Sequence, residues 1–213
     1  MSIEQKSITP YRESIKEKIV ATAMRSFAQR GIKAVKMDDI AAELSVSKRT
    51  LYELFTDKEN LLFEGVCMYH AQKHREMEEL TRQGDNVMTI ILDIYIMKLK
   101  ELSMTSPLFY RDLVKYPKIL AYIRKDKKKN HDRFLEFMQR GVKEGYFRSE
   151  TNYDLIAHLF DAVGSHMMEH LFEHYGFEEL FINMFFVPLR GFCTEKGVKA
   201  LDHFLSQHKN KDK

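Results

Sequence analysis

The sequence has no tryptophan, only four prolines and nine glycines among 213 residues, and only two cysteines. Cys67 and Cys193 stand far apart, without the short spacing of a metal-binding pair. This usage argues against a disulfide-stabilised scaffold and suits a reducing cytoplasm. Because prolines and glycines are few and no stretch alternates apolar with polar residues, we expect an all-α protein.

Long apolar runs are also missing. The most apolar stretch, residues 90–97, contains Asp93 and is far shorter than the roughly 20 residues of a membrane-spanning helix. Residues 1–18 lack the apolar core of a signal peptide. No glycine-rich phosphate loop, Gly-x-Ser-x-Gly or Cys-x-x-Cys motif is present. We therefore expect a cytoplasmic protein that binds no membrane, has no cofactor and is not an enzyme. The net charge of +3 confines any nucleic-acid surface to a local patch.

The most informative stretch runs from residue 36 to residue 61. Apolar residues recur at helical spacing up to Leu44, and a short break follows at residues 45–46. Ser47 is suited to cap a second helix, whose apolar side holds Leu51, Leu54 and Phe55. Its outer side carries Lys48, Arg49, Thr50, Tyr52 and Glu53. A capping box at residues 56–59, from Thr56 to Glu59, opens the next helix. Two short helices joined by a tight turn predict a helix-turn-helix.

This stretch resembles the DNA-binding domain of the TetR family of bacterial transcriptional regulators. The resemblance covers about residues 12–62 and is carried by Ile19, Ala23, Phe27, Gly31, Asp39, Ile40, Ala41, Val46, Ser47, Lys48, Thr50, Leu51, Tyr52, Phe55, Lys58, Glu59 and Leu61. Members usually have threonine or serine near residue 36, whereas Lys36 leaves the cap of the second helix to the backbone or to Asp38. Relatives often have glycine at residue 49, where this sequence has Arg49. Both departures place charge beside the expected DNA surface, so the operator sequence of a relative cannot be transferred.

The resemblance implies that the recognition helix enters the major groove with its N-terminal residues toward the bases. Arg49 is a candidate for reading a guanine, and Thr50 for meeting a base or a thymine methyl group. Phosphate contacts are assigned to Lys48, Tyr52 and Lys58. The predicted DNA-binding residues are Lys36, Ser47, Lys48, Arg49, Thr50, Tyr52 and Lys58.

Periodicity predicts helices throughout the rest of the chain. Their expected ranges are residues 11–30, 58–82, 87–104, 107–115, 118–143, 152–175, 178–193 and 198–207. Residues 1–10 are expected to form a flexible arm, residues 1–61 the three-helix DNA-binding domain, and residues 62–213 a larger helical effector-binding and dimerisation bundle. The resemblance implies a homodimer that packs through 152–175 and 178–193. The alternative is that the apolar residues of these helices form intramolecular core.

The resemblance also implies a cavity for a small-molecule effector inside the bundle. The suggested walls are Tyr95, Phe109, Phe134, Met138, Phe160 and Met167, although each could equally be a core residue. Effector binding would shift the helix at residues 58–82 and change the separation of the two recognition helices on a palindromic operator.

Histidines recur at helical spacing in two places. His158, His166, His170 and His174 would share one stripe, and His70 and His74 form a second pair. Such pairs can bind zinc or nickel, but Glu-x-x-His, the di-iron bundle signature, is missing. We interpret these histidines as ordinary polar residues and assign no metal site. The resemblance implies a ligand-responsive repressor; the alternative is a metal-binding or enzymatic bundle that uses the stripe of His158, His166, His170 and His174.

Overall fold

The protein is a bundle of helices in the computed structural model, which describes residues 10–167 and 174–208. The helices are α1 (Pro10–Arg30), α2 (Met37–Glu43), α3 (Lys48–Leu54), α4 (Lys58–Arg82), α5 (Val87–Ser103), α6 (Pro107–Leu113), α7 (Pro117–Lys129), α8 (His131–Lys143), α9 (Tyr153–His166), α10 (Phe177–Phe192) and α11 (Glu195–His208). Within the described residues, extended pairing is limited to one bridge between Phe147 and Cys193. The all-α prediction is confirmed. No described helix is long and apolar enough to cross a membrane.

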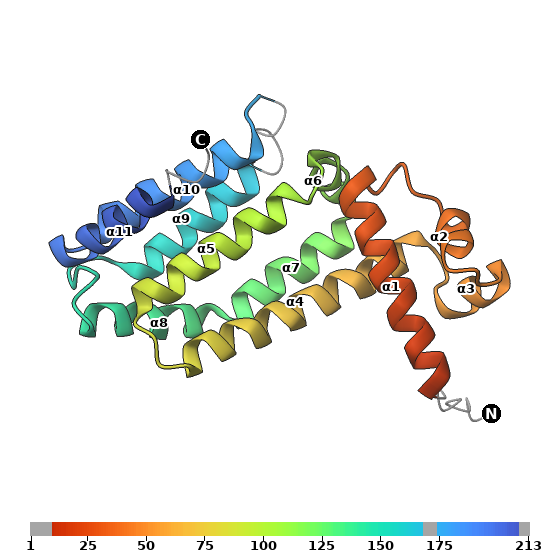
Figure 1. Cartoon of the computed structure of the whole chain (residues 1–213), viewed down its shortest axis with the longest axis horizontal. Coiled ribbons are helices and arrows are strands. Elements are labelled where there is room, and N and C mark those ends of the chain that lie inside the picture. The colour runs from red at the N-terminus through yellow and green to blue at the C-terminus, as the bar shows by residue number, and fades with distance from the viewer. Residues whose placement is uncertain (1–9, 168–173, 209–213) are drawn as a thin grey trace.

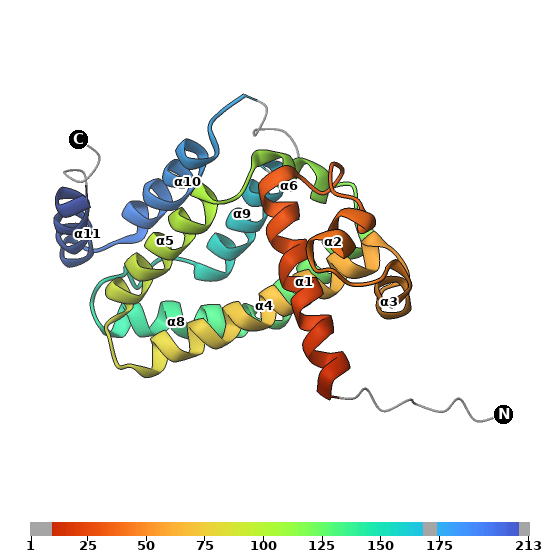
Figure 2. The ribbon, with the colours of Figure 1, turned by 45° about the vertical axis from the view of Figure 1, so that its right-hand side comes forward.

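Helix α4 links the two ends of the molecule. Figures 1 and 2 show α1–α3 gathered at one end, while α4 runs away from them along the bundle and ends beside α8. Helix α1 packs on α4 and α6, and α5 packs on α8, α10 and α11. A single helix therefore reaches from the helix-turn-helix end of the molecule along the rest of the bundle.

The first hydrophobic core lies under the helix-turn-helix but is not built from it alone. Its fully buried members include Phe27, Leu51 and Phe55 from the N-terminal helices. Leu113 of α6 and Ile119, near the start of α7, are buried in the same cluster. Partly buried side chains packed against this core include Phe109, Tyr116, Tyr122 and Ile123. Residues beyond position 100 thus complete the core of the N-terminal region.

Helix α6 is also held to the end of α1 by polar contacts. The backbone N–H of Lys33 donates to the Asp112 carboxylate at 2.7 Å, and the N–H of Ser106 donates to the Ala28 carbonyl at 2.7 Å. Asp112 is buried, so losing its acceptor oxygens would leave a backbone donor without a partner. Gly31 lies between these contacts with a φ of +83°, and Leu108 packs directly over its Cα.

The second core fills the other end of the bundle. Met88 of α5, Met138 of α8 and Leu201 of α11 are buried together in it, with Leu189 and Phe192 of α10. The Tyr95 ring contacts the rings of Phe185, Phe186 and Phe204. The bundle therefore has an aromatic interior separate from the first core.

Three predicted helix boundaries differ from the structure. The helix expected at 118–143 is divided at Asn130 into α7 and α8. The Asn130 side-chain amide donates to the Asp126 carbonyl at 2.7 Å, a local bond that competes with helical pairing. Helix α9 ends at His166, whereas the prediction ran to residue 175 across residues 168–173, which lie outside the described residues. Helix α11 begins at Glu195, three residues before the predicted 198.

The predicted helix caps were partly wrong. At α2 the backbone alternative is confirmed, because the N–H of Asp39 donates to the Lys36 carbonyl at 3.1 Å. The alternative of Asp38 is wrong, since it is Asp39 that accepts from the N–H of Lys36, at 2.9 Å. At α4 the N-cap is Asp57, whose carboxylate accepts from the N–H of Asn60 at 2.7 Å, so the capping box starting at Thr56 was wrong. A carboxylate also interacts favourably with the positive end of the helix dipole, which favours Asp57 over its neighbour.

Replacing Gly31 by alanine should destabilise the protein more than the matched change at Gly84. Both glycines have positive φ, +83° and +85°, but a Cβ at Gly31 would lie 2.9 Å from Leu108 Cβ, whereas nothing lies within 4 Å at Gly84. We expect Gly84→Ala to lower the free energy of unfolding by about 1–2 kcal/mol through backbone strain, and Gly31→Ala by about 1–3 kcal/mol more through overpacking. Urea unfolding followed by circular dichroism measures both. Equal losses of unfolding free energy in the two variants would show that α6 does not pack closely against the end of α1 at Gly31.

Candidate nucleic-acid interface

The helix-turn-helix predicted from residues 36–61 is present, and its turn is tight. Ser45 adopts a left-handed conformation with a φ of 54°, and the N–H of Val46 donates to the Ala41 carbonyl at 3.0 Å. Ser47 caps α3 by accepting from the N–H of Thr50 at 3.0 Å, as predicted. Leu51 and Phe55 have no exposed surface, which confirms that they are core residues. The buried back of α3 therefore fixes which side chains face outward.

The outward face of α3 carries the residues that were predicted to contact DNA. Lys48 and Tyr52 are exposed, and the Arg49 side chain is 88% exposed. Thr50 is partly buried, and its hydroxyl lies 2.8 Å from that of Ser47. Lys36 is exposed at the start of α2. The structure thus places basic, hydroxyl and phenol groups together on and beside the first turns of a surface helix.

Both basic residues of this face are held by acidic neighbours. Lys48 Nζ lies 2.6 Å from the carboxylate of Asp38, and Arg49 Nε lies 2.8 Å from that of Glu53. The hydrogen bond to Asp38 raises the pKa of Lys48, and the hydrogen bond to Glu53 raises the pKa of Arg49. Both side chains are therefore charged at neutral pH. Solvent-exposed ion pairs are weak, so DNA phosphates or base edges can replace these carboxylates at little cost.

Lys58 has a different environment from the other predicted DNA contacts. Its ammonium donates to the carbonyls of Ile32 at 2.9 Å and Val35 at 3.0 Å, with the Lys33 carbonyl at 3.5 Å. These bonds tie the loop between α1 and α2 to the start of α4. A phosphate contact by Lys58 stays a prediction, but its position in this structure is that of a residue that supports the DNA-binding face.

A cavity of about 940 Å³ lies in the bundle, bounded by residues of α4, α5, α8, α9 and α10. Three predicted wall residues, Phe134, Met138 and Phe160, line it. Three others lie elsewhere. Phe109 packs against the first core because α6 docks on α1, Met167 is buried at the end of α9, and Tyr95 contacts Phe185 without lining the cavity itself.

The polar side of this cavity was not anticipated. Helix α4 contributes Lys73, His74, Met77, Glu78, Thr81 and Arg82, and the break between α7 and α8 contributes Asn130. The sequence signal for this polar wall was the four-residue spacing of His74, Glu78 and Arg82, which places them on one side of a helix. A charged stripe of this kind normally indicates a solvent-exposed helix face and not a cavity wall.

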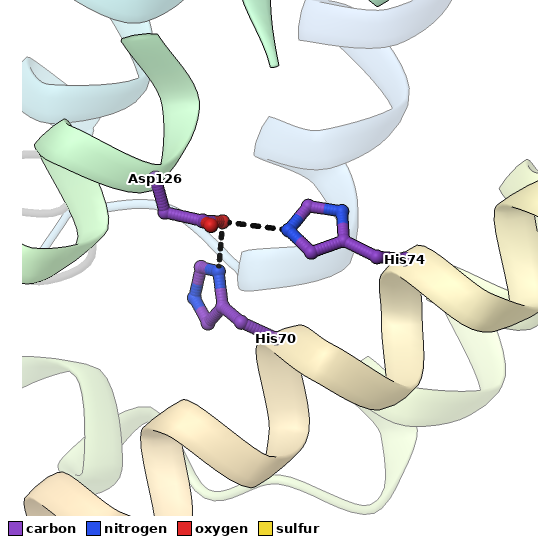
Figure 3. Close-up of side chains that lie close together, drawn as sticks. All are labelled: His70, His74 and Asp126. Atoms are coloured by element: carbon purple, nitrogen blue, oxygen red, sulfur yellow. Dashed lines mark hydrogen bonds and ion pairs between the residues drawn. The ribbon is translucent and has the colours of Figure 1, made fainter. Parts of the chain in front are cut away.

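The histidine stripe of α9 does not come together as a metal cluster among the described residues. The side chain of His158 is 70% exposed and its ring stacks on that of His131, with ring centroids 5.8 Å apart. His166 and His174 are exposed, and His170 lies outside the described residues. Within the described part of the chain, metal-ligating atoms of three residues converge in one place, at His70, His74 and Asp126, which Figure 3 shows.

Comparisons with known proteins identify relatives of the helix-turn-helix region and of the whole chain. The family model for bacterial regulatory proteins of the tetR family matches residues 19–64. The chain therefore carries a TetR-family helix-turn-helix region. It is 23% identical over 147 residues to the HTH-type transcriptional repressor KstR2 of Mycobacterium tuberculosis, an overlap of 65% of this chain and 72% of that protein. With this region, the protein is a DNA-binding transcriptional regulator.

Solved structures share the fold over most of the chain. A TetR-family regulator from Agrobacterium tumefaciens matches with a TM-score of 0.66 and 16% identity, covering 86% of this chain and 100% of the other. The reduced form of NemR from E. coli matches with a TM-score of 0.67 and 16% identity, covering 85% and 97%. These similarities support the helix-turn-helix followed by a helical domain. They give no support to a metal-binding or enzymatic bundle as the activity of this protein.

Replacing Lys58 by methionine should separate a supporting role from a phosphate contact. The change keeps the aliphatic stem but removes the donor to the Ile32 and Val35 carbonyls. We expect a loss of about 1.5–3 kcal/mol in the free energy of unfolding, the range for hydrogen bonds that involve a charged group. Denaturant unfolding without DNA measures it, with the exposed Lys36→Met as the control. Unchanged stability together with weaker DNA binding would instead assign Lys58 to a phosphate.

Proposed function

We propose that this protein is a ligand-responsive repressor that binds a palindromic operator as a homodimer. The main support for DNA binding is the outward face of α3. Lys48, Arg49 and Tyr52 are exposed there, while Leu51 behind them is fully buried. A helix anchored in this way presents its N-terminal side chains rigidly, as insertion into a major groove requires. Repression is proposed because the relative KstR2 is named a repressor.

The surface of α9 supports dimerisation. Leu155, Leu159 and Val163 follow one another at four-residue spacing and are 54%, 51% and 45% exposed. Val187 of α10 is 67% exposed. An apolar stripe of this kind is costly to leave in water, and a second copy of the same stripe is a self-complementary cover for it. This arrangement supports pairing through α9 and α10, the helices within the predicted ranges 152–175 and 178–193.

The cavity supports response to a small molecule. Its volume of about 940 Å³ is in the range of drug-sized ligand sites, and its walls combine aromatic side chains with a polar stripe of α4. The effector we propose is therefore an amphipathic molecule with an apolar body and at least one polar group. It must bind the DNA-incompetent arrangement more tightly than the competent one, because a ligand of equal affinity for both shifts nothing.

The geometry also suggests how the two sites communicate. In a dimer on a palindrome, half-sites lie about one helical turn of DNA, or a multiple of it, apart. Helix α4 begins in the helix-turn-helix and lines the cavity with its second half. A shift of α4 caused by the effector changes the separation of the two α3 helices, and a small change prevents both from docking at once.

Selection from a random duplex library should enrich a palindrome that this protein binds in a salt-dependent manner. The logarithm of the association constant should fall linearly with the logarithm of salt concentration, by about 0.9 per phosphate contact. Tyr52→Ala should weaken binding to all sequences and leave this slope unchanged, because a neutral phenol displaces no counterion from a phosphate. Arg49→Ala should relax the preference at one position of each half-site, a loss of about 1–3 kcal/mol. Fluorescence anisotropy measures both.

The control for these substitutions is Tyr175→Ala, an exposed tyrosine in the loop before α10. It should leave DNA affinity and salt slope unchanged. Enrichment of no sequence, or equal losses for Tyr175→Ala and Tyr52→Ala, would contradict DNA binding through the α3 face.

A charge in the middle of the α9 stripe should separate the subunits. Leu159→Lys places an ammonium where the proposed interface excludes water, so we expect the dimer dissociation constant to rise at least tenfold. The matched control is Met104→Lys, because Met104 is 67% exposed at the end of α5 and away from the stripe. Sedimentation velocity over a range of protein concentrations gives the oligomeric state. A wild-type monomer would contradict the homodimer, and an unchanged dimer in Leu159→Lys would place the interface elsewhere.

A further inference from the structure

Three side chains from two helices converge where α4 runs beside α7. His70 Nδ1 lies 2.8 Å from Asp126 Oδ2, and His74 Nε2 lies 2.9 Å from the same oxygen. Figure 3 shows both rings directed at the carboxylate across the gap between the helices. The side chain of Asp126 is 14% exposed, that of His70 19% and that of His74 36%. One donor atom from each residue lies within 4.8 Å of the other two.

Without an ion, hydrogen bonds hold this group together. One nitrogen of each ring faces Asp126 Oδ2, and the Asn130 amide nitrogen lies 3.3 Å from His74 Nε2, the nitrogen that faces Asp126. When these two ring nitrogens carry no proton, their lone pairs and the carboxylate oxygen point to one place. A cation binds at such a place by taking the position of the protons.

The ligand types are those of a borderline transition-metal ion. Two imidazole nitrogens and one carboxylate oxygen form a set that Zn²⁺ accepts, with bonds of about 2.0–2.2 Å. Tetrahedral coordination at that length separates neighbouring ligand atoms by about 3.4 Å. The present separations of 2.8 and 2.9 Å therefore need to widen by about half an ångström, which small side-chain rotations supply.

The cavity provides the remaining coordination position. His74 and Asn130 line the cavity of about 940 Å³, so an ion at this group would face it and could carry water or a ligand there. Asn130 also holds Asp126, because its amide donates to the Asp126 carbonyl at 2.7 Å and lies 3.5 Å from Oδ1. Such a neighbour keeps the ligating carboxylate oriented.

We propose that His70, His74 and Asp126 bind one divalent transition-metal ion, which fastens α4 to α7 at the edge of the cavity. This group is distinct from the histidines of α9. Ile119 of α7 is buried in the first core, and Tyr122 packs against that core. An ion that joins α4 to α7 therefore fixes α4 relative to the core under the helix-turn-helix. The ion therefore changes operator affinity; this second part rests on the proposed function, whereas metal binding itself does not.

The experiment uses the full chain, stripped with a chelator and titrated with Zn²⁺ by isothermal calorimetry. We expect one ion per chain, with binding weakened at least tenfold by His74→Ala and by Asp126→Asn. The matched controls are His158→Ala and Asp154→Asn, an exposed histidine and aspartate with His158 Nε2 3.8 Å from Asp154 Oδ1. They should leave Zn²⁺ affinity unchanged. Co²⁺ should give visible absorption bands of a low-coordinate site, lost in the two site variants.

Circular dichroism of each stripped variant shows whether it is folded, so that a loss of binding is not a loss of structure. No uptake at 100-fold excess of Zn²⁺ over protein, or equal losses in the site and control variants, would overturn the site. Operator affinity is then compared with and without Zn²⁺ for wild type and His74→Ala. A Zn²⁺-dependent change in wild type alone supports the coupling, and an unchanged affinity overturns it while leaving the site intact. Failure to find an operator would overturn the proposed function but would not affect the Zn²⁺ titration.

Discussion

The structure depends on a hydrophobic core that two parts of the chain must share. Phe27, Leu51 and Phe55 of the helix-turn-helix are buried against Leu113 and Ile119 of α6 and α7. Separating these parts would return several large apolar side chains to water, at about 25 cal/mol for each square ångström exposed. The DNA-binding end therefore cannot swing freely on a linker. Its orientation is set by the helices that carry the rest of the bundle, which is what a ligand-controlled regulator requires.

Farther along α4 the contacts change from apolar to polar. The Tyr69 hydroxyl donates to Glu101 at 2.6 Å, and Lys98 joins the same carboxylate at 2.8 Å. Burial opposes ionisation of Glu101, but the charge of Lys98 and the bonds around it lower its pKa. Burial likewise opposes ionisation of Asp126, whose pKa is lowered by hydrogen bonds from the two α4 histidines. Polar contacts are directional, and a ligand can replace one hydrogen-bond partner by another. The second half of α4 is therefore the part whose position a ligand can change, whereas the apolar contacts hold the first half in place.

Local features of the sequence predicted the buried and outward faces of α3 well. Ser47 as a cap, Leu51 and Phe55 as the buried side, and the exposed position of Arg49 all follow from helical periodicity and from side-chain capping chemistry, which act within a few residues. Periodicity also located most helices, but it does not say which core an apolar face enters. Phe109 and Phe134 look alike in sequence, yet the first completes the N-terminal core and the second lines the cavity. The three-carbonyl contact of Lys58 and the meeting of His70 and His74 with Asp126 join residues far apart in sequence, so no local pattern could reveal them.

The shared core has a consequence for synthesis on the ribosome. Helices α1–α4 leave the exit tunnel well before α6 and α7, and until then the surface that Leu113 and Ile119 cover is open to water. The helix-turn-helix of the nascent chain therefore has its local caps and turn but an incomplete interior. Completion of this interior waits for the middle of the chain, so the helices that complete the core also fix the orientation of the helix-turn-helix.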